Sequence, residues 1–219
     1  MGSNVLVFDD SNSVNDLANF ISRAKTVDDD AALLTGRGTA LAVYVPVLVP
    51  AELGQGQYTI LAMRVHRLSE AADINKSYSL ASIQDRLARM GDSSLEFSLP
   101  PAEENPRWAG ISVPMSGWAE TSTVSDDVLK SAAQNGIDEV AQSLPANPGL
   151  PVVSQIRQHV WSAPILEADE EIPAGAAFAM QALGFLTAGE RSKVYRSGNW
   201  TRISNGKGHV LVRKSSMLG

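Results

Sequence analysis

Seven cationic side chains gather in the last thirty residues of an otherwise acidic chain, and these side chains could bind an anion. Of the 18 Lys and Arg and 24 Asp and Glu in the chain, residues 190–219 hold seven and one, which leaves 11 cations and 23 anions before them. The segment alternates strand-like runs with Gly-containing turns, a pattern typical of β-hairpins. Cations carried on such strands can hold a phosphate or a carboxylate. The candidate contact residues are Arg196, Trp200, Arg202, Lys207, His209 and Arg213.

The faces of the predicted strands limit how well these cations can act together. Because side chains alternate along a strand, Trp200 and Arg202 share one face, and Thr201 and Ile203 share the other. The cations therefore do not all point to one side. Three interpretations stay open: a half-buried sheet whose cations pair with the acidic remainder, a contact for a protein or small anionic partner, and a contact for nucleic acid like the wing of a winged-helix module.

Catalytic and metal-binding patterns are weak in this sequence. The three histidines, His66, His159 and His209, have no metal-ligand spacing, and neither His-Glu-x-x-His nor Gly-x-Ser-x-Gly occurs. The short glycine pairs around Gln55 and Lys207 match no phosphate-binding loop. We therefore expect no metal, no cofactor and no catalytic residue. The enzyme alternative depends on a cleft lined by Trp108, Trp118, Trp161 and Trp200 together with Arg202 and His209.

Composition narrows the class of protein. The 219 residues are 44% hydrophobic and contain no cysteine, which favours a folded core and excludes disulfides and thiol chemistry. No apolar run approaches the ~20 residues of a membrane helix, and no secretory signal is visible. We expect a cytoplasmic protein without a membrane partner. The net charge of −6 argues against general coating of nucleic acid.

Periodicity predicts mixed elements in the first half of the chain. Apolar spacing predicts helices at residues 14–25, with Ser13 as N-cap, and at 81–90. Three aspartates at 28–30 precede a short Ala-Leu run, and acids at a helix start predict a helix at 31–36 that stops at Gly36. Strands are expected at 38–49 and 58–68 around a Gly-rich loop at 53–57, with shorter strands at 76–80 and 95–99.

The second half reads as helices followed by the basic strands. Ser125 is expected to cap a helix through residue 144, and further helices are expected at 151–161 and 173–184, where small residues favour close packing. We thus predict an α+β fold, with antiparallel strands and helices in region 1–100 and helices followed by a terminal β-hairpin sheet in region 107–219. A single-domain arrangement is also compatible with the pattern.

Three segments carry a resemblance to a known family. They are Ala176-Ala-Phe-Ala followed by Ala-Leu-Gly-Phe-Leu, the pattern Arg37-Gly-x-x-Leu-Ala-Val-Tyr-Val-Pro, and Arg107-Trp-Ala-Gly-Ile-Ser. Over most of its length the chain resembles an uncharacterised family of actinobacterial proteins, and this resemblance implies no activity. From the residues alone we expect a soluble, non-catalytic binding or interaction protein. The alternatives are a small-molecule enzyme and a nucleic-acid-binding accessory protein, and a homo-oligomer is compatible with each.

Overall fold

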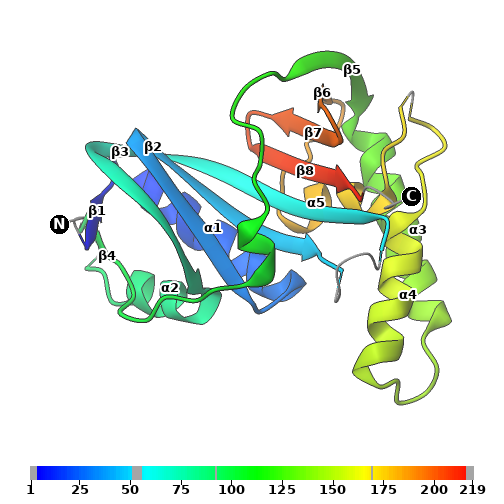
Figure 1. Cartoon of the computed structure of the whole chain (residues 1–219), viewed down its shortest axis with the longest axis horizontal. Coiled ribbons are helices and arrows are strands. Elements are labelled where there is room, and N and C mark those ends of the chain that lie inside the picture. Colours follow the sequence, from blue (N-terminus) through cyan, green and yellow to red (C-terminus); the bar gives the residue numbers. More distant parts are fainter. Residues whose placement is uncertain (1–3, 51–55, 92, 169, 216–219) are drawn as a thin grey trace. The chain divides into compact units, whose positions relative to one another are not determined.

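The computed structural model describes residues 4–50, 56–91, 93–168 and 170–215. They form two compact units, Met1–Pro46 with Met63–Val113 and Val47–Ala62 with Pro114–Gly219. Two long strands, β2 (Ala31–Leu48) and β3 (Tyr58–Ser79), contribute to both units (Figure 1). The domain boundary expected between residues 100 and 107 stays a prediction, and the second unit also includes residues 47–62. Residues 53–55 of the expected Gly-rich loop lie outside the described residues.

The first unit places helices against strands. Besides its parts of β2 and β3, its elements are β1 (Val5–Val7), α1 (Ser11–Val27), α2 (Leu80–Ala88), β4 (Glu96–Ser98) and the 3-10 helix η1 (Arg107–Gly110). The apolar face of α1 buries Leu17, Phe20 and Ile21, as its 3.6-residue spacing predicts. The N-cap is Asp10 rather than Ser13: its carboxylate accepts a hydrogen bond from the Ser13 backbone N–H at 2.7 Å. The helix therefore begins three residues earlier than predicted.

The expected helix at residues 31–36 is wrong, because this segment forms the beginning of β2. Ala31 and Leu34 are almost fully buried there, and burial against the unit outweighs the weak local helix preference. Gly36 is not a helix stop. A Cβ at this position would come 2.7 Å from Cγ2 of Ile74, so glycine allows β2 and β3 to approach closely. Asp30 instead accepts a hydrogen bond from the Trp108 indole N–H at 3.0 Å.

The second unit combines helices with an antiparallel meander. Its elements are β5 (Ala119–Ser125), α3 (Asp126–Ser143), α4 (Leu150–Ser162), α5 (Ala174–Ala182), β6 (Arg191–Ser197), β7 (Trp200–Asn205) and β8 (Gly208–Lys214). The sheet order is β2-β3-β8-β7-β6-β5, and β5 to β8 pair antiparallel. The strand-turn-strand prediction for the basic tail is thereby confirmed. Ser125 caps α3 as predicted, because its hydroxyl oxygen accepts a hydrogen bond from the Asp127 backbone N–H.

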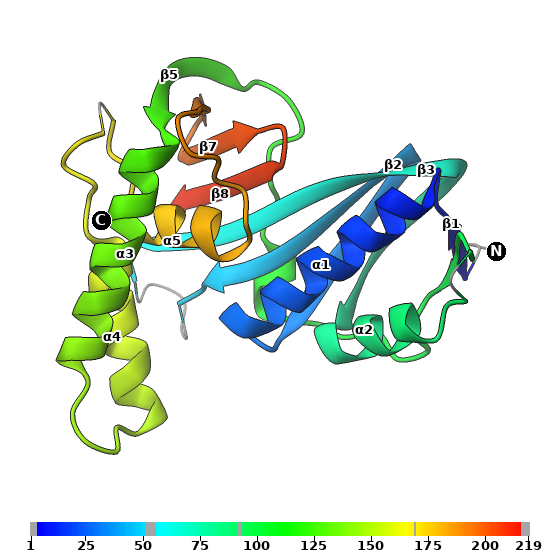
Figure 2. The same ribbon diagram turned by 180° about the vertical axis from the view of Figure 1, so that it is seen from behind.

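The three helices of the second unit, α3, α4 and α5, pack against one another (Figure 2). The ring of Trp161 stacks on Phe178 with 4.5 Å between centroids and lies directly against Gly136 of α3. Gly175 of α5 contacts the same tryptophan. The predicted α+β class is therefore confirmed. Among the described helices, none is long and apolar enough to cross a membrane.

Candidate functional site

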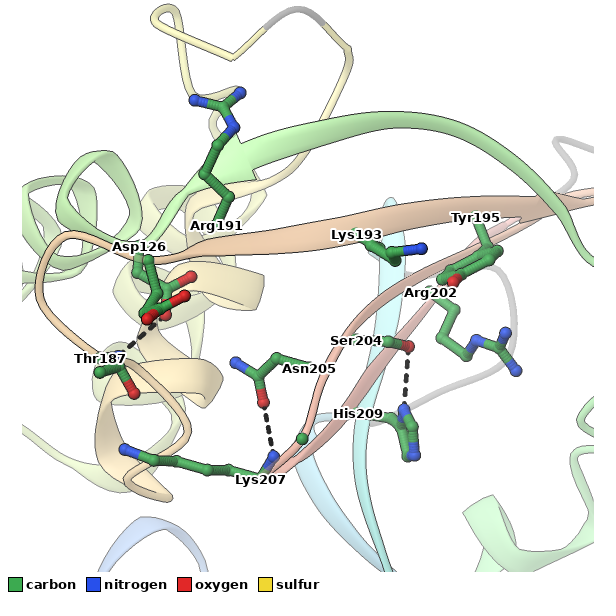
Figure 3. A pocket seen from close by; sticks show the side chains of 12 residues that line it. Asp126, Thr187, Arg191, Lys193, Tyr195, Arg202, Ser204, Asn205, Lys207 and His209 are labelled. Carbon is green, nitrogen blue, oxygen red and sulfur yellow. Dashed lines mark hydrogen bonds between the residues drawn. The ribbon is translucent and has the colours of Figure 1, made fainter.

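The second unit carries a pocket of about 630 Å³ on one face of its basic strands (Figure 3). Most of its walls come from β6, β7, β8 and the turn between β7 and β8. The lining residues are Asp126, Thr187, Glu190, Arg191, Lys193, Tyr195, Arg202, Ser204, Asn205, Gly206, Lys207 and His209. Four of these side chains are Lys or Arg and two are carboxylates, so the pocket holds an excess of two positive charges when its histidine is neutral.

Strand register brings these side chains together. Lys193, Ser204 and His209 lie opposite one another across β6, β7 and β8, and Tyr195 lies opposite Arg202. Directly opposed residues on antiparallel strands point to the same face, which places all five on the pocket side. The alternate residues of β7 and β8, such as Ile203 and Val210, are fully buried on the opposite face. The core therefore fixes the orientation of the pocket side chains.

Arg202 contacts two aromatic rings. Its guanidinium carbon is 4.6 Å from the ring centroid of Trp118 and 4.5 Å from that of Tyr195. The Trp118 indole N–H donates to the Pro114 carbonyl at 2.9 Å, which holds that ring in place. No carboxylate of the described residues lies within ion-pair distance of Arg202, and its buried Nε has no hydrogen-bond partner among them. Burial partly desolvates the charge of Arg202 and thereby lowers its pKa.

His209 is a neutral side chain at physiological pH. Burial and, as the smaller cause, the positive charge of Arg202 together lower its pKa to about 4. Its Nδ1 lies 2.9 Å from the Ser204 hydroxyl oxygen. The imidazole and the hydroxyl therefore form a polar pair that adds no charge to the pocket.

The other cations of the pocket are held by the protein. Lys193 pairs with Glu120 at 2.9 Å, and this hydrogen bond raises the pKa of Lys193 and lowers that of Glu120. Arg191 donates to the Thr123 hydroxyl and carbonyl at 2.8 and 3.0 Å. The Lys207 ammonium donates to the Leu186 carbonyl at 3.1 Å. Arg202 thus differs from its neighbours, since aromatic rings rather than hydrogen-bond acceptors hold it.

The buried carboxylate of the pocket has structural partners. Asp126, which is 2% exposed, accepts hydrogen bonds from the Thr187 backbone N–H at 2.8 Å and from the Ser192 hydroxyl at 2.7 Å. These bonds fix the start of α3 to the loop before β6 and to β6 itself. Glu190, the second carboxylate, is exposed at the rim.

The structure brings three of the six sequence-predicted contact residues into the pocket: Arg202, Lys207 and His209. Arg196 instead forms an ion pair with Glu170 at 2.9 Å, and Trp200 is only 4% exposed. Arg213 lies on β8 and is not among the lining residues. The prediction that tail cations pair with acidic groups holds for Arg196, Lys193 and Lys214, which pairs with Glu171 at 2.9 Å.

Sequence reasoning missed Lys193, Tyr195 and Ser204 as members of the site. The alternation Arg191, Lys193, Tyr195 gave a signal, because these residues share one face of a predicted strand. The expected four-tryptophan cleft is wrong: Trp161 is buried among helices, and Trp200 is buried in the sheet. Only Trp118 reaches the pocket region, through its contact with Arg202.

The remaining two histidines lie elsewhere. His159 is exposed on α4. His66 is buried in the first unit beside the ion pair of Arg64 and Asp16. Its Nδ1 is 3.3 Å from Asp16 Oδ2, but these two atoms do not form a hydrogen bond. Burial lowers the pKa of His66 to about 4, with the Asp16 carboxylate opposing and the Arg64 charge assisting the shift. No group of three or more metal-ligating side chains occurs in the part of the chain that the structure describes.

Each half of the chain matches a known protein family. Residues 1–110 match the family described as "Domain of unknown function (DUF8010)", and residues 113–217 match "Domain of unknown function (DUF8185)". No curated protein matches the chain. The expected resemblance to a family without assigned function is confirmed, and its actinobacterial origin stays a prediction.

Solved structures show which fold the chain has. It aligns with the DNA polymerase sliding clamp of Caulobacter crescentus with a TM-score of 0.54, 11% identity and 98% of this chain covered. The alignment with the sliding clamp of Bartonella birtlesii, bound to griselimycin, has a TM-score of 0.53 and 10% identity and covers 97% of this chain. The alignment with DNA polymerase III subunit β of Borrelia burgdorferi has a TM-score of 0.52 and 8% identity and also covers 97% of this chain. The chain spans 66%, 65% and 64% of these proteins, less than two thirds of their length. It has a sliding-clamp-like fold.

Proposed function

The chain belongs to the family described as domain of unknown function DUF8010, and we propose that it is a non-catalytic interaction protein that works with DNA-associated protein assemblies in the cytoplasm. One observation carries this proposal: the likeness to sliding clamps extends over 97–98% of the chain and so includes both units. The Bartonella birtlesii and Borrelia burgdorferi proteins are β subunits of DNA polymerase III. At an identity of 10–11%, the likeness shows a shared fold alone, and the function is our proposal.

The chemistry of the pocket supports a role without catalysis. A hydroxyl beside an imidazole, as in Ser204 and His209, is the first part of a nucleophile pair. Such a pair also needs a group that orients the second ring nitrogen, and no described carboxylate does this. With a pKa of about 4, His209 is too weak a base to activate a hydroxyl near pH 7. The enzyme alternative therefore lacks its base.

Charge pairing supports a protein partner over direct binding to a DNA backbone. Tail cations outside the pocket, such as Arg196 and Lys214, are neutralised by glutamates. The α3 helix carries four carboxylates and one lysine, which would repel phosphates. Affinity for a DNA backbone grows with the number of cations that replace counterions, and Lys193, Arg196 and Lys214 are already paired with glutamates. We therefore expect the chain to reach DNA through other proteins or through further copies of itself.

In-cell cross-linking tests the proposal. The tagged chain is cross-linked in its native host and purified under denaturing conditions, and the attached proteins are identified by mass spectrometry. The control is an unrelated acidic protein of similar size. Enrichment of DNA polymerase subunits and other proteins of DNA replication or repair over the control is the expected result. A set that contains only metabolic enzymes, or no enriched protein, would refute the proposal.

A further inference from the structure

The pocket of the second unit has the dimensions of a small-ligand site. Its volume of about 630 Å³ lies within the range that small-molecule pockets occupy, roughly 300–1,000 Å³. Figure 3 shows Lys193, Tyr195, Arg202, Ser204 and His209 gathered at one end. Asn205 and Lys207 lie toward the other end, near Thr187 and Asp126. Such a pocket suits a compact molecule with an anionic group at one end.

Arg202 supplies the anchor for an anion. Trp118 and Tyr195 both lie against the guanidinium, which leaves its N–H groups, directed outward in the plane of the group, as donors. A planar fork of N–H donors matches the oxygens of a phosphate or a carboxylate. Its charge has no carboxylate partner among the described residues, and burial makes an unpaired charge costly. An incoming oxyanion would supply the missing acceptors.

The remaining groups favour a phosphate over a carboxylate. Four cations line the pocket against Asp126 and Glu190, and since Lys193 is also paired with Glu120, the local excess is at least one positive charge. His209 does not add to this excess, because burial and Arg202 hold its pKa near 4. A phosphate monoester carries a charge between about −1.5 and −2 at pH 7, whereas a carboxylate carries −1. Ser204 can add a hydroxyl hydrogen bond, and the Tyr195 ring adds an apolar wall.

We propose that this pocket binds the phosphate group of a small phosphorylated molecule, with the stacked guanidinium of Arg202 as the anchor. This binding is independent of the proposed interaction with DNA-associated proteins, since it requires only the second unit's strands and Trp118. A nucleic-acid backbone is the competing source of the same phosphate chemistry. The paired cations around the pocket, Arg196 and Lys214, argue against it.

Isothermal titration calorimetry of the full chain tests the proposal. The probes are phenyl phosphate, inorganic phosphate, benzoate and a 12-base-pair DNA duplex, in a phosphate-free buffer of low ionic strength. We expect saturable binding of both phosphate probes and at least about fivefold weaker binding of benzoate. Arg202→Gln should weaken phenyl phosphate binding at least about tenfold, the usual effect of losing hydrogen bonds to a charged group. Arg202→Lys should fall between, because it keeps the charge and loses the fork.

Two further variants keep the test interpretable. Arg213→Gln makes the same charge change on the neighbouring strand outside the pocket and should leave the affinity within about twofold of the native chain. If Arg202→Gln does not fold, Lys193→Gln replaces it, with an expected loss of about threefold or more. The proposal is overturned by absence of saturable phosphate binding, by equal affinity of Arg202→Gln and the native chain, or by benzoate binding as tightly. Displacement of phenyl phosphate by the duplex with the same Arg202 dependence would also overturn it.

Discussion

Gly136, in the middle of α3, offers a strong test of how the second unit is packed. It is buried, and a Cβ built on it would lie 2.2 Å from Cζ3 of Trp161 and 2.9 Å from Cη2. The tryptophan cannot move away freely, because it is 3% exposed and stacks on Phe178. Gly175 packs against the base of the same side chain, since a Cβ there would lie 3.0 Å from Trp161 Cβ. Glycine at 136 therefore makes room for the ring.

Two opposing effects decide the outcome of Gly136→Ala. Alanine is favoured over glycine in a helix interior by about 1 kcal/mol. Forcing an extra methyl group into a well-packed core costs about 1–3 kcal/mol, and a 2.2 Å contact with a confined ring belongs at the upper end of that range. We expect the free energy of unfolding to fall by roughly 2 kcal/mol. For a chain of this length that corresponds to about 4–8 °C in Tm.

Urea unfolding followed by tryptophan fluorescence measures the effect. Asn135→Ala is the matched control: this neighbouring residue of α3 is exposed, so alanine there should give a small gain from helix propensity. A Trp161→Leu background removes the ring, and in it Gly136→Ala should become neutral or stabilising. The reasoning is refuted if Gly136→Ala is as stable as the native chain while Trp161 is present.

Three further changes test other parts of the account. Burial holds the pKa of His66 near 4 in the folded chain, against about 6.5 when unfolded, so the stability that the neutral imidazole contributes is present above pH 6.5 and is lost as the pH falls toward 4. The free energy of unfolding, measured with urea at pH 7 and at pH 4.5, should fall by about 2–3 kcal/mol less in His66→Gln than in the native chain. Gly208→Ala, whose Cβ would lie 2.4 Å from the Phe185 ring, should cost about 2 kcal/mol in urea unfolding, whereas Gly91→Ala should not. Burial and Glu171 raise the pKa of Tyr58 to about 12, so a spectroscopic titration of Tyr58→Phe should show one fewer phenol of raised pKa than a titration of the native chain.

Local patterns predicted most of the elements. Apolar spacing located the helices around residues 14–25 and 125–144, and Ser125 was identified as a cap from its type and the two aspartates after it. The failure at residues 31–36 has a tertiary cause, since burial and the partner strand turn Ala31 and Leu34 into strand residues. A glycine at position 136 is unfavourable in a helix interior, and the reason for it is a tryptophan 25 positions away. Such contacts leave no local signal in a single sequence.

The candidate site was predicted in part. Charge clustering pointed to the tail, and Arg202, Lys207 and His209 do line one pocket. Strand alternation alone could not show that Arg196 pairs with Glu170, because that glutamate belongs to a loop preceding α5. The contact of Trp118 with Arg202 also joins distant segments. The pocket depends on the register of three strands, which hydrophobic patterning does not determine without knowledge of the turns.

The effect of nuclease on cross-linked partners tests the central claim, interaction with DNA-associated proteins, most directly. The abundance of DNA polymerase and repair subunits attached to the chain is measured with and without digestion of DNA before purification. We predict that these subunits are enriched and that their abundance is unchanged by digestion, because proteins rather than the DNA backbone make the contact. Loss of all such partners on digestion, or their absence in both samples, would contradict the account.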